Sequence, residues 1–187
     1  MGRTSGGSGG GGGGGAMKLI SSQVLAAPAA SVTFSAIPAT YNHLKLVCNV
    51  RTASAGATDI IGAYFNGDAA AHYDNLTILG NNVTVSMGTA TGQTEAVLSS
   101  VAGNGATAGV SGISETDIPT YAGTTFFKTA VTVGGMDDSP TGAGDTAVNE
   151  ILSKWRNTAA ITSIEIFAVA SAANFMTGSA FYMYGIT

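Results

Sequence analysis

The amino-acid sequence predicts an all-β protein built as an antiparallel β-sandwich. The clearest sign is the segment 44–51, where Leu44, Leu46, Cys48 and Val50 alternate with more polar residues. A period of two places these four side chains on one face of a strand, packed into a core. Similar segments recur to the C-terminus, and turns rich in glycine and asparagine separate them. Many short strands with almost no helical pattern are typical of a sandwich.

Turn residues set the limits of the expected strands. Asn66-Gly67 closes one strand, Gly80-Asn81-Asn82 joins two strands as a hairpin, and Gly134-Gly135 is expected to break another. The prolines lie at the ends of apolar runs, where they do not interrupt a ladder. The strands are therefore expected at 31–34, 43–51, 60–65, 76–79, 83–86, 96–101, 108–118, 126–133, 148–155, 161–169 and 179–184.

One segment has a helical alternative. Glu150 and Lys154 are four residues apart, as in a helical ion pair, so a short helix over 148–155 competes with a strand. The turn that follows Trp155 favours the strand. The core should be aliphatic and aromatic, and its expected members are Leu44, Leu46, Val50, Ile61, Phe65, Trp155, Ile164, Ile166 and Phe181.

Composition divides the chain into a linker and one domain. Residues 1–16 are dominated by glycine and precede a second methionine, so they are interpreted as an artificial, disordered linker. Residues 17–187 suit a single domain. No apolar run reaches the roughly 18 residues of a membrane span, and a net charge of −4 argues against nucleic-acid binding. No secretory signal follows Met17, which indicates a protein made in a cytoplasm.

Low charge also predicts self-association. Charged residues make up 10% of the chain, against about 25% in ordinary soluble proteins. Small apolar and hydroxyl side chains take their place, and such β-rich surfaces are prone to aggregation when they are left bare. We therefore expect a symmetric homo-oligomer, with a trimer as the favoured state.

The sequence contains no convincing reaction centre. Cys48 and His43 lie five residues apart on one strand and point to opposite faces, so Cys48 is expected to be a buried structural thiol. Gly103-x-Gly105 and Gly142-x-Gly144 match a loose dinucleotide pattern but lack the helix that this pattern requires. We expect no enzyme activity, no catalytic residues and no cofactor.

Two loops are the candidate binding sites, because strands are committed to packing and loops carry recognition. The loop 66–74 holds Asp68, His72, Tyr73 and Asp74. There Tyr73 could stack on a sugar ring, while Asp68 or Asp74 accepts hydrogen bonds from the sugar hydroxyls. The competing interpretation is a solvated connector.

The second candidate loop, 137–146, contains three carboxylates. Asp137, Asp138 and Asp145 are a weak calcium candidate, since their spacing fits no EF-hand loop. Acidic loops are more often simply solvated, so no metal is expected.

Several motifs resemble a family of small virion proteins of tailed bacteriophages. These motifs are Phe34-x-x-Ile37-Pro38-Ala39-Thr40-Tyr41, Phe65-Asn66-Gly67-Asp68, Ile118-Pro119-x-Tyr121-Ala122-Gly123 and Trp155-x-x-Thr158-x-Ala160-Ile161. The resemblance covers essentially all of 17–187. It implies a jelly-roll domain on tail fibres, receptor-binding tips or the capsid surface, often trimeric and without catalytic residues.

The sequence thus leaves two functional hypotheses. The first is a non-enzymatic structural protein on the virion surface, either capsid decoration or a tail component, whose partners are its own copies and other virion proteins. The second is a tail-tip adhesin that binds a host cell-surface glycan. An enzyme is a distant third, and neither nucleic acid nor a membrane is an expected partner.

Overall fold

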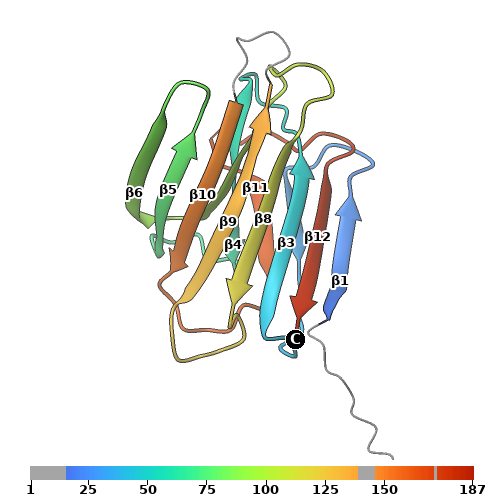
Figure 1. Ribbon diagram of the computed structural model, residues 1–187. Coiled ribbons are helices and arrows are strands. Elements are labelled where there is room, and N and C mark those ends of the chain that lie inside the picture. The colour runs from blue at the N-terminus through green and yellow to red at the C-terminus, as the bar shows by residue number, and fades with distance from the viewer. Residues whose placement is uncertain (1–15, 139–145, 171) are drawn as a thin grey trace, which may run out of the picture.

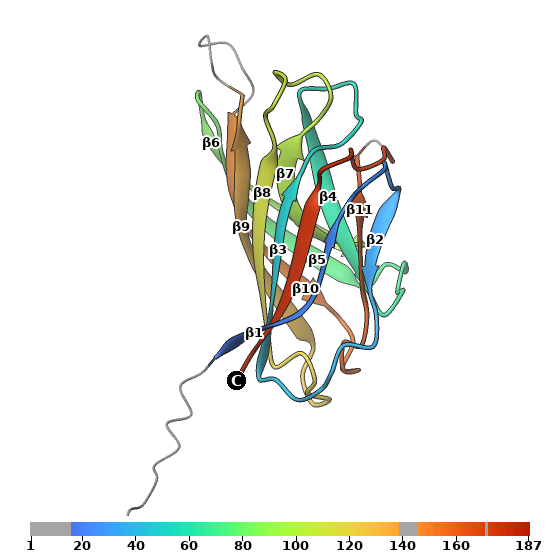
Figure 2. The same cartoon turned by 90° about the vertical axis from the view of Figure 1, so that its right-hand side faces the viewer.

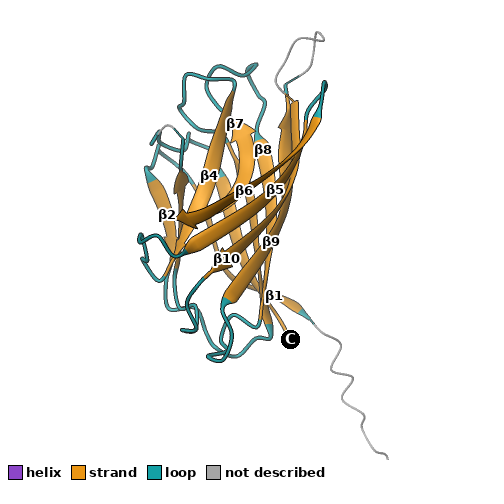
Figure 3. Cartoon of the chain, turned by 90° about the vertical axis from the view of Figure 1, so that its left-hand side faces the viewer, coloured by secondary structure: helices purple, strands orange, loops and turns teal. Residues whose placement is uncertain are grey.

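The computed structural model describes residues 16–138, 146–170 and 172–187 as two antiparallel sheets packed face to face. Figures 2 and 3 show the two layers from opposite sides, and Figure 1 looks onto the larger sheet. Within these residues there is no helix. The predicted all-β sandwich is therefore confirmed.

The two sheets differ in size. The larger has eight strands, in the spatial order β1 (Met17–Val24), β12 (Ala180–Ile186), β3 (His43–Val50), β8 (Gly112–Pro119), β9 (Lys128–Asp137), β10 (Thr146–Trp155), β5 (Tyr73–Gly80) and β6 (Val85–Gln93). The smaller has four, in the order β2 (Ser31–Phe34), β11 (Ile164–Ala168), β4 (Thr58–Phe65) and β7 (Ala96–Ala102). A large part of the eight-stranded sheet therefore extends beyond its four-stranded partner.

The core lies between the sheets and is built from alternating residues. In β10 every second side chain from Ala147 to Trp155 is buried, and β8 shows the same alternation. All nine side chains predicted for the core are buried, each at most 1% exposed. At one end Trp155 packs against Phe65 and Tyr73, with ring centroids 5.8 and 6.4 Å apart. Cys48 is also in the core, as expected, and burial raises the pKa of its thiol.

Several elements differ from what the sequence predicts. The first strand, β1, was not predicted, because nearly all of its side chains are exposed and it shows no apolar alternation. β6 runs on to Gln93 through small residues that resemble a loop in sequence. The segment 148–155 belongs to strand β10, so the helical alternative is wrong.

The prediction that Gly134 and Gly135 break a strand is wrong, because both lie inside β9. Gly135 has a φ of +151°, and a Cβ there would collide with the carbonyl oxygen of Ala147 on β10. A Cβ on Gly134 would collide with the Ser99 hydroxyl of β7. Both glycines permit a close approach between neighbouring backbones, which is a recurrent reason for glycine within a strand.

Side chains from the larger sheet cap the free edge of β7. Asn75 accepts a hydrogen bond from the Val97 amide at 3.1 Å and donates to the Glu95 carbonyl at 3.1 Å. Asn149 accepts from the Ser100 amide at 3.0 Å, and Ser153 donates to the Val97 carbonyl at 2.9 Å. These contacts take the place of a neighbouring strand and protect an edge that could otherwise pair with another chain.

Candidate interaction surface

The outer face of the eight-stranded sheet exposes aliphatic side chains. Strands β5, β8, β9 and β10 turn one set of residues into the core and the alternate set to the outside, and the edge strand β6 continues the outer face with side chains that are exposed on both of its faces. The outward set is apolar where an ordinary solvated sheet is polar. We call its nine members the aliphatic face: Leu76, Ile78, Val85, Met87, Ile113, Val131, Val133, Val148 and Leu152, which are 37–79% exposed.

The strand register arranges the aliphatic face in rows across the sheet. The first row contains Val85, Gly80, Val148, Gly135 and Ile113, in the order β6, β5, β10, β9, β8. The second row contains Met87, Ile78, Glu150, Val133 and Glu115. The third contains Thr89, Leu76, Leu152, Val131 and Asp117. Aliphatic side chains therefore occupy neighbouring positions on several strands and form one continuous patch.

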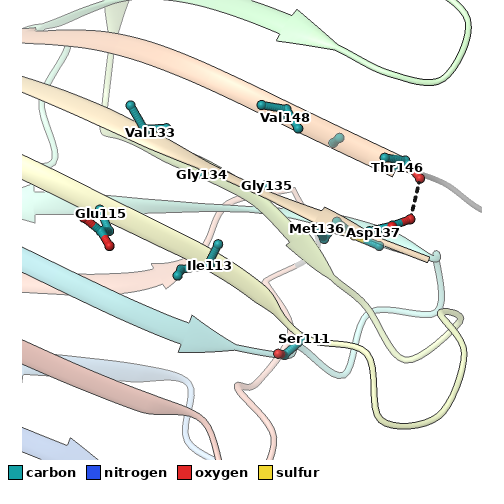
Figure 4. Close-up of a pocket in the computed structure, with 11 residues that line it drawn as sticks. Ser111, Ile113, Glu115, Val133, Gly134, Gly135, Met136, Asp137, Thr146 and Val148 are labelled. Carbon is teal, nitrogen blue, oxygen red and sulfur yellow. Dashed lines mark hydrogen bonds between the residues drawn. The ribbon is translucent and has the colours of Figure 1, made fainter. Parts of the chain in front are cut away.

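A shallow depression of about 800 Å³ lies within this face. Figure 4 shows Ile113, Val133 and Val148 around Gly134 and Gly135, which line the depression without side chains. At one end Thr146 donates a hydrogen bond to Asp137 at 2.9 Å. The surface is therefore not flat: aliphatic side chains project around a hollow.

Charged residues border the aliphatic face, and one lies within it. Lys45 pairs with Glu115 at 2.9 Å and with Asp117 at 3.5 Å. The hydrogen bond from Lys45 to Glu115 raises the pKa of the Lys45 ammonium, although partial burial opposes the shift. Glu150 stands between Ile78 and Val133 in the second row and has no ion pair among the described residues. The face thus has negative charges, and the two described cations beside it, Lys45 and Lys154, are already paired with carboxylates.

The residues predicted in the loop 66–74 do lie together, but in a structural network. Asp68 accepts hydrogen bonds from Trp155 Nε1 at 2.7 Å, from His72 Nδ1 at 2.8 Å and from the Ala70 amide at 3.0 Å. Burial opposes the charge of Asp68, but the bonds from Trp155 and His72 outweigh it and lower the pKa of this carboxyl. Asp68 therefore holds the loop onto the core.

Tyr73 is not available to a ligand, which corrects the predicted sugar-stacking role. Its ring is 0% exposed and packs on Phe65 and Trp155. Its hydroxyl accepts from the Phe65 amide and donates to the Asp68 carbonyl. Asp74 is also engaged, through Lys154 at 2.9 Å and the Gly92 amide at 3.0 Å. Only His72, with a half-exposed side chain, remains open to solvent in this group.

The second predicted loop falls largely outside the described residues, and so does Asp145. Asp137 accepts from Thr146, and Asp138 is buried and accepts from the Thr107 amide at 2.8 Å. Within the described ranges, no group of three His, Cys, Asp or Glu side chains is placed to hold a metal ion. The described part also contains no helix long and apolar enough to span a membrane.

Sequence reasoning missed the aliphatic face, although a signal for it was present. Val131, Val133, Val148 and Leu152 occupy the alternate positions of strands whose other face is already committed to the interior. Apolar residues in both phases of a strand indicate that both faces are to be covered.

Comparisons with protein families, curated proteins and solved structures found no match.

Proposed function

We propose that this chain is a non-enzymatic structural protein of a bacteriophage virion, carried on the particle surface as capsid decoration or as a tail component. The observation that carries the proposal is the aliphatic face. Nine exposed aliphatic side chains on adjoining strands form a surface that favours contact with another protein rather than with water. The motifs that resemble phage virion proteins supply the biological setting.

The arrangement of polar groups supports assembly rather than catalysis. The hydrogen-bonding side chains of the loop 66–74 are used to fix Asp68 and Tyr73 against the core. Low charge across the whole chain, at 10%, suits a subunit whose surface is partly covered by neighbours. A homo-oligomer accounts for both features. The trimer expected from the sequence stays a prediction.

The sandwich is further proposed to be an elaborated jelly roll. When β1, β12 and the hairpin β9–β10 are set aside, the remaining strands have the orders β2-β11-β4-β7 and β3-β8-β5-β6. Along the chain these eight strands pass between the two sheets as in a pair of Greek keys. The hairpin β9–β10 then widens one sheet and supplies four of the nine side chains of the aliphatic face.

A second candidate function, glycan binding by an adhesin, is favoured by one aromatic pair on the other face of the molecule. Tyr64 of β4 and Phe167 of β11 are half-buried, with ring centroids 4.2 Å apart. Glu165 pairs directly with Tyr64 across the two strands. Aromatic rings beside a carboxylate suit a sugar ring and its hydroxyls. Loss of glycan binding in Tyr64→Ala, with an unchanged melting temperature, would favour this function.

The proposal is tested on intact particles. Gold-labelled antibody against the folded domain should decorate capsids or tails in electron micrographs, and the protein should be found in the mass spectrum of purified particles. Particles that lack both the label and the protein would refute the virion assignment. Label confined to the tail tip would favour the adhesin.

A further inference from the structure

We infer that the aliphatic face binds a second copy of this chain, sheet against sheet, across a two-fold axis that runs along the strands between β9 and β10. This inference deepens the proposed structural function and rests on it. A two-fold contact through this face gives a dimer, so the trimer expected from the sequence would have to use a different surface of the domain.

The size of the face fits such a contact. Its nine side chains are 37–79% exposed on five adjoining strands, and together they present on the order of several hundred Å² of apolar surface, the size of patch that marks interaction sites. A stable interface of standard size buries about 800 Å² on each partner. The aliphatic face with its polar border is therefore large enough for a stable dimer and larger than the isolated apolar groups of an ordinary surface.

The first row is self-complementary about the proposed axis. Across β5, β10, β9 and β8 its residues are Gly80, Val148, Gly135 and Ile113. A two-fold rotation between β9 and β10 lays β10 over β9 of the second copy, and β5 over β8. Val148 then faces Gly135 of the second copy, and Ile113 faces its Gly80. On these four strands each projecting side chain meets a glycine, as close packing of two sheets requires, and Val85 of β6 lies opposite Asn49 of β3 in the second copy.

The charged residues obey the same symmetry. In the second row Glu150 faces Val133 of the second copy, and Glu115 faces its Ile78. In the third row Leu152 faces Val131, and Asp117 faces Leu76. No carboxylate meets another carboxylate directly, whereas an axis through β10 would set Glu150 against its own copy. Like charges in direct opposition would oppose association.

Glu150 nevertheless weakens the contact. Its carboxylate enters an apolar surface with no cation paired to it among the described residues. Removing a charge from water without a partner is costly. We therefore expect Glu150→Gln to lower the dissociation constant of the dimer. If a basic partner bound this face instead, Glu150→Gln would weaken that binding.

The test compares two exposed valines on the same outer face in sedimentation velocity runs across a concentration series. Val148 is 63% exposed on β10, and Val24 is 59% exposed on the distant edge strand β1. Val148→Lys should weaken the dissociation constant of the dimer by about tenfold or more, which corresponds to about 1.4 kcal/mol. Val24→Lys should leave it unchanged within about twofold, and Glu150→Gln should strengthen it. Circular dichroism verifies that each variant is folded.

Chemical cross-linking tests the register. Proteins carrying Ile78→Cys and Glu115→Cys, mixed and treated with a short bismaleimide, should give a covalent heterodimer. In the proposed dimer these two positions face each other across sheets that lie about 10 Å apart. Two copies of the same variant would place their cysteines three strand spacings apart, about 14 Å, in addition to the distance between the sheets. Each variant treated alone should cross-link poorly.

A wild-type protein that stays monomeric at high micromolar concentration would overturn the inference. So would equal weakening by Val148→Lys and Val24→Lys, or a weakened dimer in Glu150→Gln. None of these results bears on whether antibody labels the particle, so the inference and the proposed function can fail separately.

Discussion

Tyr73 shows how a single side chain can join a loop, a strand and the core. Its ring fills space between Phe65 and Trp155, and its hydroxyl links the Phe65 amide, at 3.0 Å, to the Asp68 carbonyl, at 2.9 Å. A buried tyrosine needs a partner for its hydroxyl, and here the backbone at the end of β4 provides one. The conformation of the 66–72 turn is therefore tied to the core.

Substitutions at Tyr73 should affect stability rather than ligand binding. Tyr73→Ala removes a fully buried ring and should cost about 3–5 kcal/mol of unfolding free energy, by analogy with buried Phe-to-Ala changes. Tyr73→Phe keeps the ring and should cost about 1 kcal/mol through the lost hydrogen bonds. Urea unfolding measures both. A Tyr73→Ala protein with the wild-type midpoint would contradict the buried position.

Asp68 should make stability depend on pH in the acid range. Its pKa is lower in the folded state than in the unfolded chain. Its contribution is therefore fully present above the unfolded value of about 4 and is lost as pH falls through the folded value. The stability difference between wild type and Asp68→Asn should thus shrink between pH 6 and pH 2.5, as measured by urea unfolding at each pH.

Asp117 provides the control for this experiment. It is half-exposed and its only described ion pair is a 3.5 Å contact with Lys45. At protein concentrations where the monomer dominates, Asp117→Asn should therefore differ little from wild type at any of these pH values, because exposed ion pairs contribute little to stability. An equal acid response in both variants would show that the Trp155 and His72 contacts do not hold Asp68 ionised.

At the scale of the element, β9 depends on glycines that its neighbours require. Gly135 lies between Val148 of β10 and Ile113 of β8, in the left-handed half of φ space and against the Ala147 carbonyl. The strand can therefore keep both ladders only without a Cβ at this position. The same absence creates the hollow of the aliphatic face.

Gly135→Ala should destabilise the domain by about 1–3 kcal/mol, the usual cost of forcing a residue into a sparsely populated backbone region, and the collision with Ala147 adds to it. Gly88 of β6 is the matched control, because a Cβ there meets nothing within 4 Å and its φ is unexceptional. Gly88→Ala should be neutral or slightly stabilising. Guanidinium denaturation midpoints compare the two. Equal midpoints would contradict the close contact at Gly135.

At the scale of the whole molecule, the two ends of the eight-stranded sheet are its most exposed parts. β1 pairs only with β12, and β6 pairs only with β5, and the side chains of both strands are almost all exposed. The central strands β3, β8, β9 and β10 have a partner on each side and bury every second residue. Stability is therefore expected to fall from the centre of the sheet to its edges.

Amide hydrogen exchange should display this gradient. The slowest amides should lie in β3, β8, β9 and β10, and those of β1 and of the outward edge of β6 should exchange fastest. Exchange read out by mass spectrometry or NMR at low protein concentration, where the monomer dominates, measures the order. Strong protection of β1 under these conditions would contradict the exposed position of that strand.

The sequence by itself determined the class of the fold and the identity of the core. Alternation in 44–51 and 161–169 is a local property that depends only on which side chains avoid water. It was therefore enough to predict the alternating strands and nine core residues, all of which are buried. Strand β1 escaped prediction because both of its faces are exposed, so its sequence lacks that alternation.

Only the tertiary structure decided which polar and apolar groups are free to act. The chain alone could not show that Tyr73 turns inward, because its environment combines Phe65 of the preceding strand β4 with Trp155 of β10, which is distant in sequence. Nor could it show that Val148, Val133 and Ile113 become neighbours, since strand order places β8, β9 and β10 side by side. A strand's own pattern specifies its two faces, but pairing with other strands determines what those faces meet.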